Sequence, residues 1–192
     1  MKPFELTGKY VSLVPLMENH IEPIYTASLP KEIWVWSATK ILSHQDAVEF
    51  VQQGILSREK NQHHPFAVID SSTQSVIGST SLRDIRFDNQ TVEIGSTWYH
   101  PSKWRTAVNT ECKYLLLQHA FETWHMNRVE FRTDELNRAS RAAIARLGAV
   151  EEGMLRKEKV LKDGRVRNTM VFSILKEEWP NVKQKLEGFL GK

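Results

Sequence analysis

Hydrophobic residues recur along this chain with two different spacings. Apolar residues return every three or four positions over Met17–Ala27 and over Gln45–Lys60, which predicts two amphipathic helices. Ser43 stands where a cap for the second helix is expected. A short strand is predicted at Val11–Leu16, before both helices. The N-terminal part of the chain is therefore expected to follow the order strand, helix, helix.

The middle of the chain shows the shorter spacing of strands. Pro65–Ile69 and Val76–Leu82 flank the polar turn Asp70–Ser75, which is the pattern of a hairpin. A third strand is expected at Thr91–Tyr99. Strict alternation would place Val92, Ile94, Ser96 and Trp98 on one face, and Glu93, Gly95, Thr97 and Tyr99 on the other.

The C-terminal half continues with helices between strands. The predicted elements are a buried helix at Asn109–Trp124, a strand at Arg128–Thr133, a short helix at Ser140–Leu147 ended by Gly148, and a hairpin of Met154–Leu161 and Val166–Leu175 about Asp163-Gly164. The full order is β-α-α-β-β-β-α-β-α-β-β. It predicts an α/β (α+β) fold, in which a mixed, mainly antiparallel sheet has helices on both faces.

Length and composition limit the function classes. A chain of 192 residues with 41% hydrophobic residues suits one domain over residues 1–192. Its net charge of +3 is dispersed, which argues against nucleic-acid binding and fits a basic cleft for a phosphorylated cofactor. One cysteine excludes an internal disulfide, and no signal-peptide or membrane-spanning apolar run occurs. The expected location is cytoplasmic, away from membranes.

Several common catalytic motifs are missing from the sequence. The dinucleotide and P-loop glycine motifs, the G-x-S-x-G elbow and zinc-ligand spacings do not occur, so no bound metal is expected. His63 and His64 are adjacent in a predicted loop, where their side chains would point apart. Cys112 lies in the predicted buried helix and is interpreted as a packed thiol.

Two segments remain as candidates for chemistry. Trp98–Glu111 combines a strand end, a tight loop and a helix start, where free backbone N–H groups and Arg105 suit a phosphate. The alternative is an ordinary connection capped by Asn109 or Thr110. In the second segment, Asn137 and Ser140 lie three apart at a helix start, which is by itself a capping pattern.

Several segments in the second half of the chain together form a pattern that a known protein family also has. They are Glu93-Ile94-Gly95, Trp104–Glu111, Arg128–Phe131, Asn137-x-x-Ser140 up to Gly148, Asp163-Gly164, Phe172-Ser173-Ile174 and Glu178-Trp179-Pro180. This pattern resembles the cofactor half of the GNAT acetyltransferase superfamily. The resemblance is strongest to the RimJ/RimL type, named for enzymes that acetylate ribosomal-protein N-termini. It covers Thr91–Pro180, whereas Met1–Gln90 agrees mainly in the order of elements.

The resemblance implies acetyl-CoA (coenzyme A) as co-substrate. The superfamily's Q/R-x-x-G-x-G/A loop falls on Trp104–Asn109, with Trp in place of Gln or Arg, Ala107 in place of the first Gly and Asn109 in place of the second. Ala107 keeps a small side chain, and asparagine tolerates positive φ better than most residues. The backbone N–H groups implied to receive the CoA phosphates are those of Arg105, Thr106, Ala107, Val108, Asn109 and Thr110.

The resemblance also implies a gap between Thr91–Tyr99 and Arg128–Thr133, into which the pantetheine arm inserts like an extra strand. Backbone groups of Trp98, Tyr99 and His100 would bind the arm and polarise the thioester carbonyl. Asn137 would bind it from the other side. Ser140 is either a hydrogen-bond donor to the departing thiolate or a simple helix cap.

The catalytic base and the acceptor site are less specified. Glu93 is the first candidate for the base, acting through water, and the alternative is a structural carboxylate paired with an arginine. His100 and Tyr99 are further candidates for the base. Trp34 and Trp36 stand between the first two predicted helices, where they would either form a wall for the acceptor amine or belong to the core.

Together these features predict an acetyl-CoA-dependent N-acetyltransferase. The acceptor would be a primary amine, on a peptide or protein N-terminus or on a small molecule, that attacks the thioester directly. Two alternatives belong to other classes: a non-catalytic acyl-CoA-binding or sensor protein, and a basic protein docking on ribosomal RNA, whose binding would depend strongly on salt. A homodimer is possible through the C-terminal hairpin or the helix after it.

Overall fold

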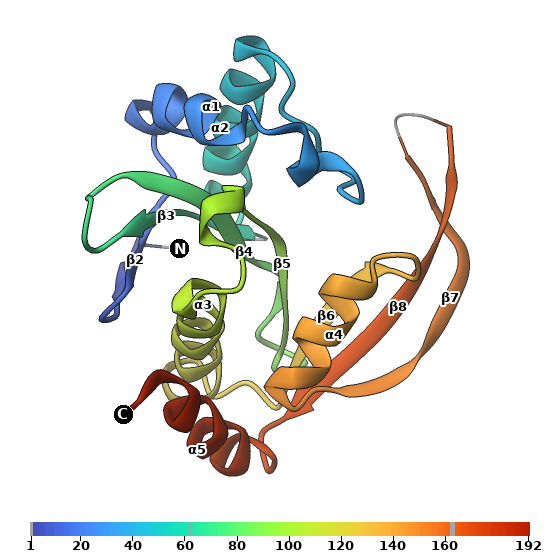
Figure 1. Ribbon diagram of the computed structural model, residues 1–192. Helices are drawn as coiled ribbons and strands as arrows, with labels where there is room; N and C mark the ends of the chain where they lie inside the picture. The colour runs from blue at the N-terminus through green and yellow to red at the C-terminus, as the bar shows by residue number, and fades with distance from the viewer. Residues whose placement is uncertain (1, 62, 162–163) are drawn as a thin grey trace.

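Eight strands form one sheet in the computed structural model, which describes residues 2–61, 63–161 and 164–192 (Figure 1). The strand order is β1-β2-β3-β4-β5-β6-β8-β7, and every neighbouring pair is antiparallel except β5 and β6. The strands are β1 (Leu6–Thr7), β2 (Val11–Pro15), β3 (His63–Asp70), β4 (Val76–Arg86), β5 (Thr91–Tyr99), β6 (Arg128–Asp134), β7 (Val150–Val160) and β8 (Val166–Leu175). The predicted mixed, mainly antiparallel sheet is confirmed.

Helices cover both faces of the sheet (Figure 1). They are α1 (Ile21–Ser28), α2 (His44–Glu59), α3 (Ala107–Gln118), α4 (Arg138–Leu147) and α5 (Trp179–Leu190). Short helical turns occur at Glu18–His20 (η1), Lys31–Trp34 (η2), Pro101–Lys103 (η3) and His119–Thr123 (η4). Two cores follow from this layering. One contains residues of α1, α2 and η2, and the larger one contains residues of α3, α4 and α5.

Most predicted elements appear close to their expected bounds, and Ser43 caps α2 through its hydroxyl as predicted. The predicted order lacked β1 and the C-terminal helix α5. His63 and His64 were expected in a loop, but they begin β3, and His64 is fully buried. Asp163 of the predicted turn lies outside the described residues. Among the described helices, none combines the length and the apolarity needed to cross a bilayer.

The alternation predicted for β5 is wrong after Gly95. Ser81 pairs with Gly95, but Ser79 pairs with Trp98, so β5 carries one extra residue opposite β4. Ser96 in this bulge has φ 48°, which is the left-handed region. The extra residue reverses the faces that follow. Trp98 packs in the core with α1 and α2, whereas Tyr99 joins Val92 and Ile94 in the core with α3.

The start of α3 also differs from the prediction. Thr106, in extended backbone, is the N-cap, and its hydroxyl accepts a hydrogen bond from the N–H of Val108. Asn109 and Thr110, the caps of the alternative interpretation, therefore lie inside the helix. Asn109 was noted as a residue that tolerates positive φ, but positive φ occurs at Arg105, with φ 59°, where the chain turns from η3 into α3. A π-helical turn, η4, follows α3 in place of the predicted straight continuation.

Candidate active site

β5 and β6 separate along most of their length. Only Thr91↔Arg128, Val92↔Val129 and Glu93↔Glu130 pair between them, although β5 continues to Tyr99 and β6 to Asp134. The bulge at Ser96 turns β5 away from β6 just beyond the last pair. The sheet is thus open between the carboxyl ends of two parallel strands, as the resemblance implied, and the sequence candidates lie around this opening.

On the β5 side, hydrogen bonds to neighbouring residues fix the orientation of the backbone at residues 98–100. The N–H of His100 donates to the carbonyl of Ile77 on β4, 2.8 Å away, and the Tyr99 carbonyl accepts a bond of 3.0 Å from the Trp104 indole. Because neighbouring residues of a strand direct their backbone groups to opposite sides, the Tyr99 N–H lies on the side of β6. Of the three expected backbone donors, Tyr99 is the one best placed toward the opening.

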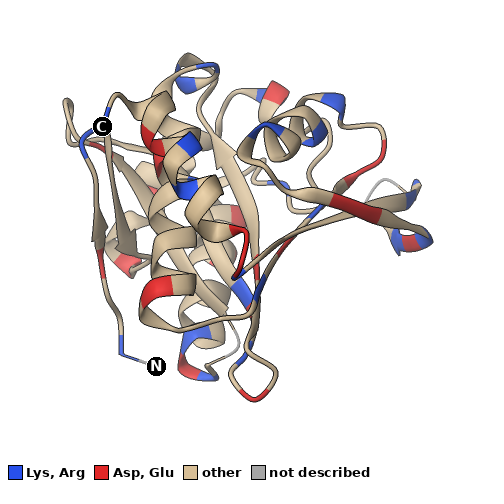
Figure 2. Ribbon diagram, turned by 90° about the horizontal axis from the view of Figure 1, so that it is seen from below, with Lys and Arg blue, Asp and Glu red and all other residues tan. Residues whose placement is uncertain are grey.

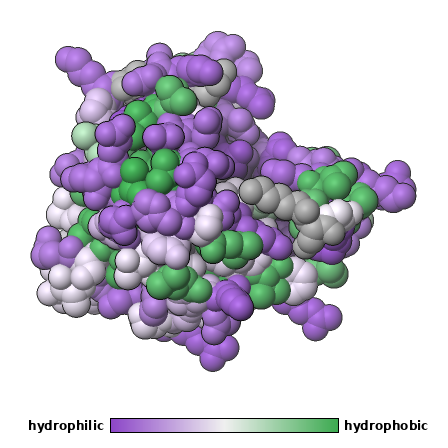
Figure 3. Space-filling view, turned by 90° about the horizontal axis from the view of Figure 1, so that it is seen from above, coloured by the Kyte–Doolittle hydropathy of each residue, from purple (hydrophilic) through white to green (hydrophobic). Residues whose placement is uncertain are grey.

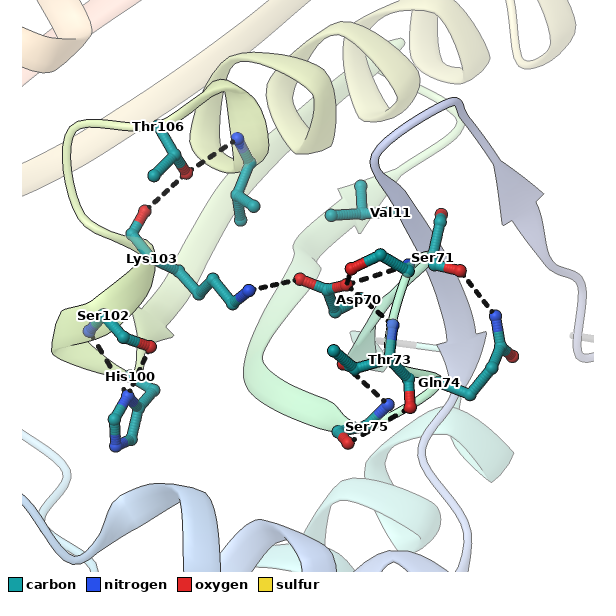
Figure 4. Close-up of polar contacts among 12 residues, drawn as sticks. Val11, Asp70, Ser71, Thr73, Gln74, Ser75, His100, Ser102, Lys103 and Thr106 are labelled. Atoms are coloured by element: carbon teal, nitrogen blue, oxygen red, sulfur yellow. Dashed lines mark hydrogen bonds and ion pairs between the residues drawn. The ribbon is translucent and has the colours of Figure 1, made fainter.

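The loop between β5 and α3 is held in place by an ion pair (Figure 4). The Lys103 ammonium lies 2.5 Å from the carboxylate of Asp70, at the end of β3. Asp70 also accepts hydrogen bonds from Ser72 and from the Thr73 N–H. The bonds from Lys103 and then Ser72 hold the pKa of the Asp70 carboxyl well below its ordinary value. This tether ties the loop before α3 to the β3–β4 turn.

The N-terminus of α3 presents donors and positive charge beside this loop. Thr106 engages the N–H of Val108 and leaves the N–H groups of Ala107 and Asn109 directed beyond the helix end. Thr110 is buried, and its hydroxyl accepts a bond of 2.8 Å from the Arg146 guanidinium of α4. Arg146 therefore adds a cation near the first turn of α3. The sequence analysis missed it because α4 and α3 are distant in sequence.

Asn137 and Ser140 lie across the opening, at the end of β6. The Asn137 side-chain oxygen accepts a bond of 3.0 Å from the Ser140 N–H, so Asn137 is the N-cap of α4. The Ser140 side chain is half-buried, and its hydroxyl makes no hydrogen bond to any described residue. Asn137 is therefore the residue that caps α4, and the Ser140 hydroxyl remains available for a hydrogen bond to a ligand.

Glu93 stands at the last residue pair between β5 and β6. Its carboxylate is buried and forms a long ion pair with Arg132, whose Nε lies 3.9 Å away. Burial raises the pKa of this carboxyl, while Arg83 and then Arg132 act in the opposite direction. A carboxylate with a raised pKa and one long ion pair suits proton transfer near neutral pH better than a tightly paired one does.

The two tryptophans of the α1–α2 connection have different surroundings. Trp34 is 3% exposed, packs against Trp98 and donates its indole N–H to the Ser28 carbonyl, so it belongs to the core. Trp36 is 38% exposed, and the guanidinium of Arg165, the residue just before β8, lies 5.6 Å above its ring. Trp36 therefore connects this loop to the β7–β8 hairpin.

A cavity of about 410 Å³ opens beside the same connection. Its wall is mainly apolar, and its lining residues are Leu29, Lys31, Trp34, Val35, Lys40, Ile41 and Leu42. Figure 3, which views the molecule from above, shows apolar patches set among hydrophilic surface. Trp34 thus contributes to the cavity wall from the edge of the core, while Trp36 does not line it.

A buried cation that the sequence analysis missed lies behind β5. Lys113 on α3 is 6% exposed and donates a bond of 2.7 Å to the Thr97 hydroxyl. Burial lowers the pKa of its ammonium to about 8. A lysine within a helix predicted to be buried all round was the signal available in the sequence. It was overlooked because the helix was interpreted from its apolar residues.

The opening between β5 and β6, the donor-rich start of α3 and the bulge on β5 define a class of acyl-transfer protein. Residues 11–150 match the family model described as the acetyltransferase (GNAT) domain. The chain belongs to this family, and the resemblance seen in the sequence is confirmed.

Relatives and solved structures agree with this assignment. The N-acetyltransferase p20 of Bacillus licheniformis, named as uncharacterized, is 26% identical over 73% of this chain and 76% of its own length. A Bacillus subtilis protein whose name proposes a ribosomal N-acetyltransferase, YdaF, is 30% identical over 57% of this chain and 58% of its own. A crystal structure of a GCN5-related N-acetyltransferase from Brucella melitensis superposes with a TM-score of 0.91, at 29% identity, covering 99% of this chain and 86% of that one.

The residues around the opening fit acetyl-CoA. An extended pantetheine arm needs a strand edge with free backbone groups, and β5 offers one beyond its third pair with β6. A pyrophosphate needs N–H donors and cations, which the first turn of α3 supplies together with Arg105 and Arg146. Ala107 in place of glycine does not obstruct this, because it is the first residue of a regular helix.

Proposed function

We propose that this protein transfers the acetyl group of acetyl-CoA to a primary amine, by direct attack of the amine on the thioester. The observation that supports this most is the sheet opening bounded by Glu93 at its closed end and by the Tyr99 N–H and the Ser140 hydroxyl along its sides. Membership of the GNAT family also supports an acetyl-transfer reaction.

Each residue has a defined task in the proposed reaction. Acetyl-CoA supplies an acetyl group already activated as a thioester. The Tyr99 N–H polarises the carbonyl oxygen, and Glu93 receives the proton that the amine loses as its nitrogen bonds to carbon. When the carbon–sulfur bond breaks, the Ser140 hydroxyl donates a hydrogen bond to the thiolate, which then takes a proton from solvent. Arg105, Arg146 and the N–H groups of Ala107 and Asn109 hold the phosphates.

The acceptor enters from the side of the α1–α2 connection in this proposal. Trp36 and the cavity beside Trp34 present apolar and aromatic surface there, which suits the organic part of an amine. Both a peptide N-terminus and a small-molecule amine fit this description. The amine is the protein's partner in the proposal, and nucleic acid and membranes are not. A cytoplasmic location follows from the supply of acetyl-CoA.

Calorimetric titration with acetyl-CoA, followed by a thiol-release assay on a panel of amines and N-terminal peptides, tests the proposal. Saturable binding and release of CoA with at least one amine are expected. Binding without release from any amine would favour the acyl-CoA-binding or sensor alternative. No binding at millimolar acetyl-CoA would contradict both. Replacing Arg105 by Gln should weaken acetyl-CoA binding about 10-fold, since one charged phosphate contact is lost.

A further inference from the structure

One face of the strands β6, β8 and β7 carries a network of charged side chains. Arg128, Glu130, Arg132 and Asp134 alternate along β6 with the core residues Val129 and Phe131, so the four share the opposite face. Charged residues of both signs also continue along the protruding hairpin (Figure 2). Arg165, which binds Asp134 on this face, also contacts Trp36 of the α1–α2 connection, where the acceptor enters in the proposed function.

Arginines on this face have carboxylate partners. Arg128 binds Glu130 at 2.9 Å and also Glu152. Arg132 binds Glu130 at 2.5 Å. Arg165 binds Asp134 at 2.5 Å. Such pairing is the ordinary state of a guanidinium that is partly removed from water, because an unpaired buried charge is costly.

Arg167 on β8 is the exception. It stands two residues before Thr169, which pairs with Asp134, so its side chain lies on the same face as Asp134. Its Nε atom is buried without a hydrogen-bond partner, and its guanidinium forms no ion pair with any residue that the structure describes. Burial lowers its pKa, although an arginine stays charged at neutral pH.

The charges around Arg167 locate its head group. It interacts electrostatically with Asp134 at the end of β6, with Glu158 on β7 and with Glu93 on β5. The like-charged Arg165 acts on it as well. Glu93 lies at the last pair between β5 and β6, so the Arg167 head group is on the side of the sheet opening. None of these carboxylates forms an ion pair with Arg167. The Arg167 guanidinium is therefore available to bind a carboxylate near the proposed catalytic base.

We propose that Arg167 binds a carboxylate that the acceptor carries close to its reactive amine. The inference rests on the proposed function and specifies its substrate class as amines that are also carboxylic acids. Glu93 and Arg167 then complement the two charges of a zwitterion, one receiving the ammonium or its proton and the other the anion. A guanidinium pairs a carboxylate through two parallel N–H donors, which favours acids over amides of the same shape.

Two kinds of acceptor carry a carboxylate close to a primary amine: a free amino acid, and a peptide with an acidic N-terminal residue. Two matched pairs distinguish them in the thiol-release assay. L-alanine is compared with L-alaninamide, and a peptide amide beginning Asp-Ala-Ala is compared with one beginning Asn-Ala-Ala. Both pairs are assayed with the wild type, with Arg167→Gln and with Arg156→Gln. Arg156 is the control because it lies on the same hairpin and is exposed.

We expect the wild type to prefer the acid in one of the pairs by at least 10-fold in kcat/KM. Arg167→Gln should abolish this preference by lowering kcat/KM for the acid about 10- to 100-fold, with little change for the amide. Arg156→Gln should behave as the wild type. Equal use of acid and amide by the wild type, or an equal loss on both members in Arg167→Gln, would overturn the inference. Absence of release from all four amines, while other amines of the panel release CoA, would likewise overturn the inference. Absence of release from every amine, with acetyl-CoA binding intact, would contradict the proposed function itself.

Stability separates a binding role from a structural one. A partly buried guanidinium without an ion pair adds nothing to folding, so the urea midpoint of Arg167→Gln should equal or exceed that of the wild type. A clearly lower midpoint would mean that the surrounding carboxylates depend on Arg167 for folding, and the assignment to substrate would be wrong. Binding of acetyl-CoA should be the same in both variants.

Discussion

Glu111 on α3 joins the N-terminal strands to the helix that carries the proposed phosphate-binding donors. The residue is fully buried. One carboxylate oxygen accepts the N–H of Lys9 at 2.9 Å, and the other accepts those of Tyr10 at 2.5 Å and Val11 at 2.9 Å. These three bonds connect sequence positions about one hundred residues apart, and they hold the start of β2 against α3. Replacing this glutamate tests how much of the fold depends on one side chain.

The expected cost follows from counting donors. In Glu111→Gln, the amide oxygen takes the place that accepts Tyr10 and Val11, and both bonds lose their charge assistance, about 1 kcal/mol each. The amide NH₂ then meets the Lys9 N–H, donor against donor, which leaves a partly buried donor unsatisfied at about 1–2 kcal/mol. The sum is about 3 kcal/mol. Glu111→Ala loses all three acceptors and leaves a cavity, and should cost about 5 kcal/mol.

Urea unfolding at pH 7 measures both variants against the wild type. Glu59→Gln is the control, because Glu59 is an exposed helical glutamate that forms no side-chain hydrogen bond or ion pair with any described residue. It should change stability by less than about 0.5 kcal/mol. The loss expected for Glu111→Ala is comparable to the whole free energy of unfolding of a typical domain. The smaller loss expected for Glu111→Gln is therefore the quantitative test. A loss below about 1 kcal/mol in Glu111→Gln would refute the assignment of three charge-assisted bonds to this carboxylate.

The remaining predictions concern catalysis and pH. Glu93→Gln should lower kcat about 100-fold in the thiol-release assay and leave acetyl-CoA binding unchanged, and a loss below threefold would remove Glu93 as the base. Ser140→Ala should lower kcat about 10-fold without destabilising α4, because the capping oxygen belongs to Asn137, and an unchanged kcat would reduce Ser140 to a structural residue. His64→Phe should raise the urea midpoint, and more so at pH 5.5 than at pH 7.5, since the ring is buried with both nitrogens unpartnered among aromatic neighbours.

The direction of the pH effect comes from three histidines. Burial lowers the pKa of His64 to about 3, and the pKa values of His63 and His119 to about 4. Above pH 6.5, these residues are neutral in both the folded and the unfolded chain, and they add no pH dependence. As the pH falls from 6.5 toward 4, these histidines bind protons in the unfolded chain but not in the folded chain, so the free energy of unfolding decreases. An equal midpoint for the wild type at pH 5.5 and pH 7.5 would contradict this account.

Several features of the fold could be predicted because they depend on local chemistry. The spacing of Ala47, Val51 and their neighbours specifies the inner face of α2, and Ser43 caps it without help from distant residues. Gly148 ends α4 with φ 110°, a conformation that glycine adopts freely. The capping pair Asn137 and Ser140 was likewise identified correctly, since its hydrogen bond spans three residues.

Other features could not be predicted, because they arise where distant segments meet. The bulge at Ser96 exchanges the faces of Trp98 and Tyr99, and no local pattern in β5 indicates it. The start of α3 at Thr106 was misplaced because several polar residues in a row each suit a helix cap, and packing selects among them. The role of Glu111 depends on backbone N–H groups of residues 9–11, which nothing in its own neighbourhood suggests.

Most of the order of helices and strands, the mixed sheet and the family could be predicted from the amino-acid sequence, because these depend on hydrophobic spacing, turn residues and short motifs. Which charges are satisfied and which are not depends on tertiary contacts. Arg128, Arg132 and Arg165 find carboxylates and Arg167 does not, although all four are alike in sequence. Pairing at these distances requires strands brought together from remote parts of the chain. The family resemblance implied the opening between β5 and β6, but the charges that face it became visible only in three dimensions.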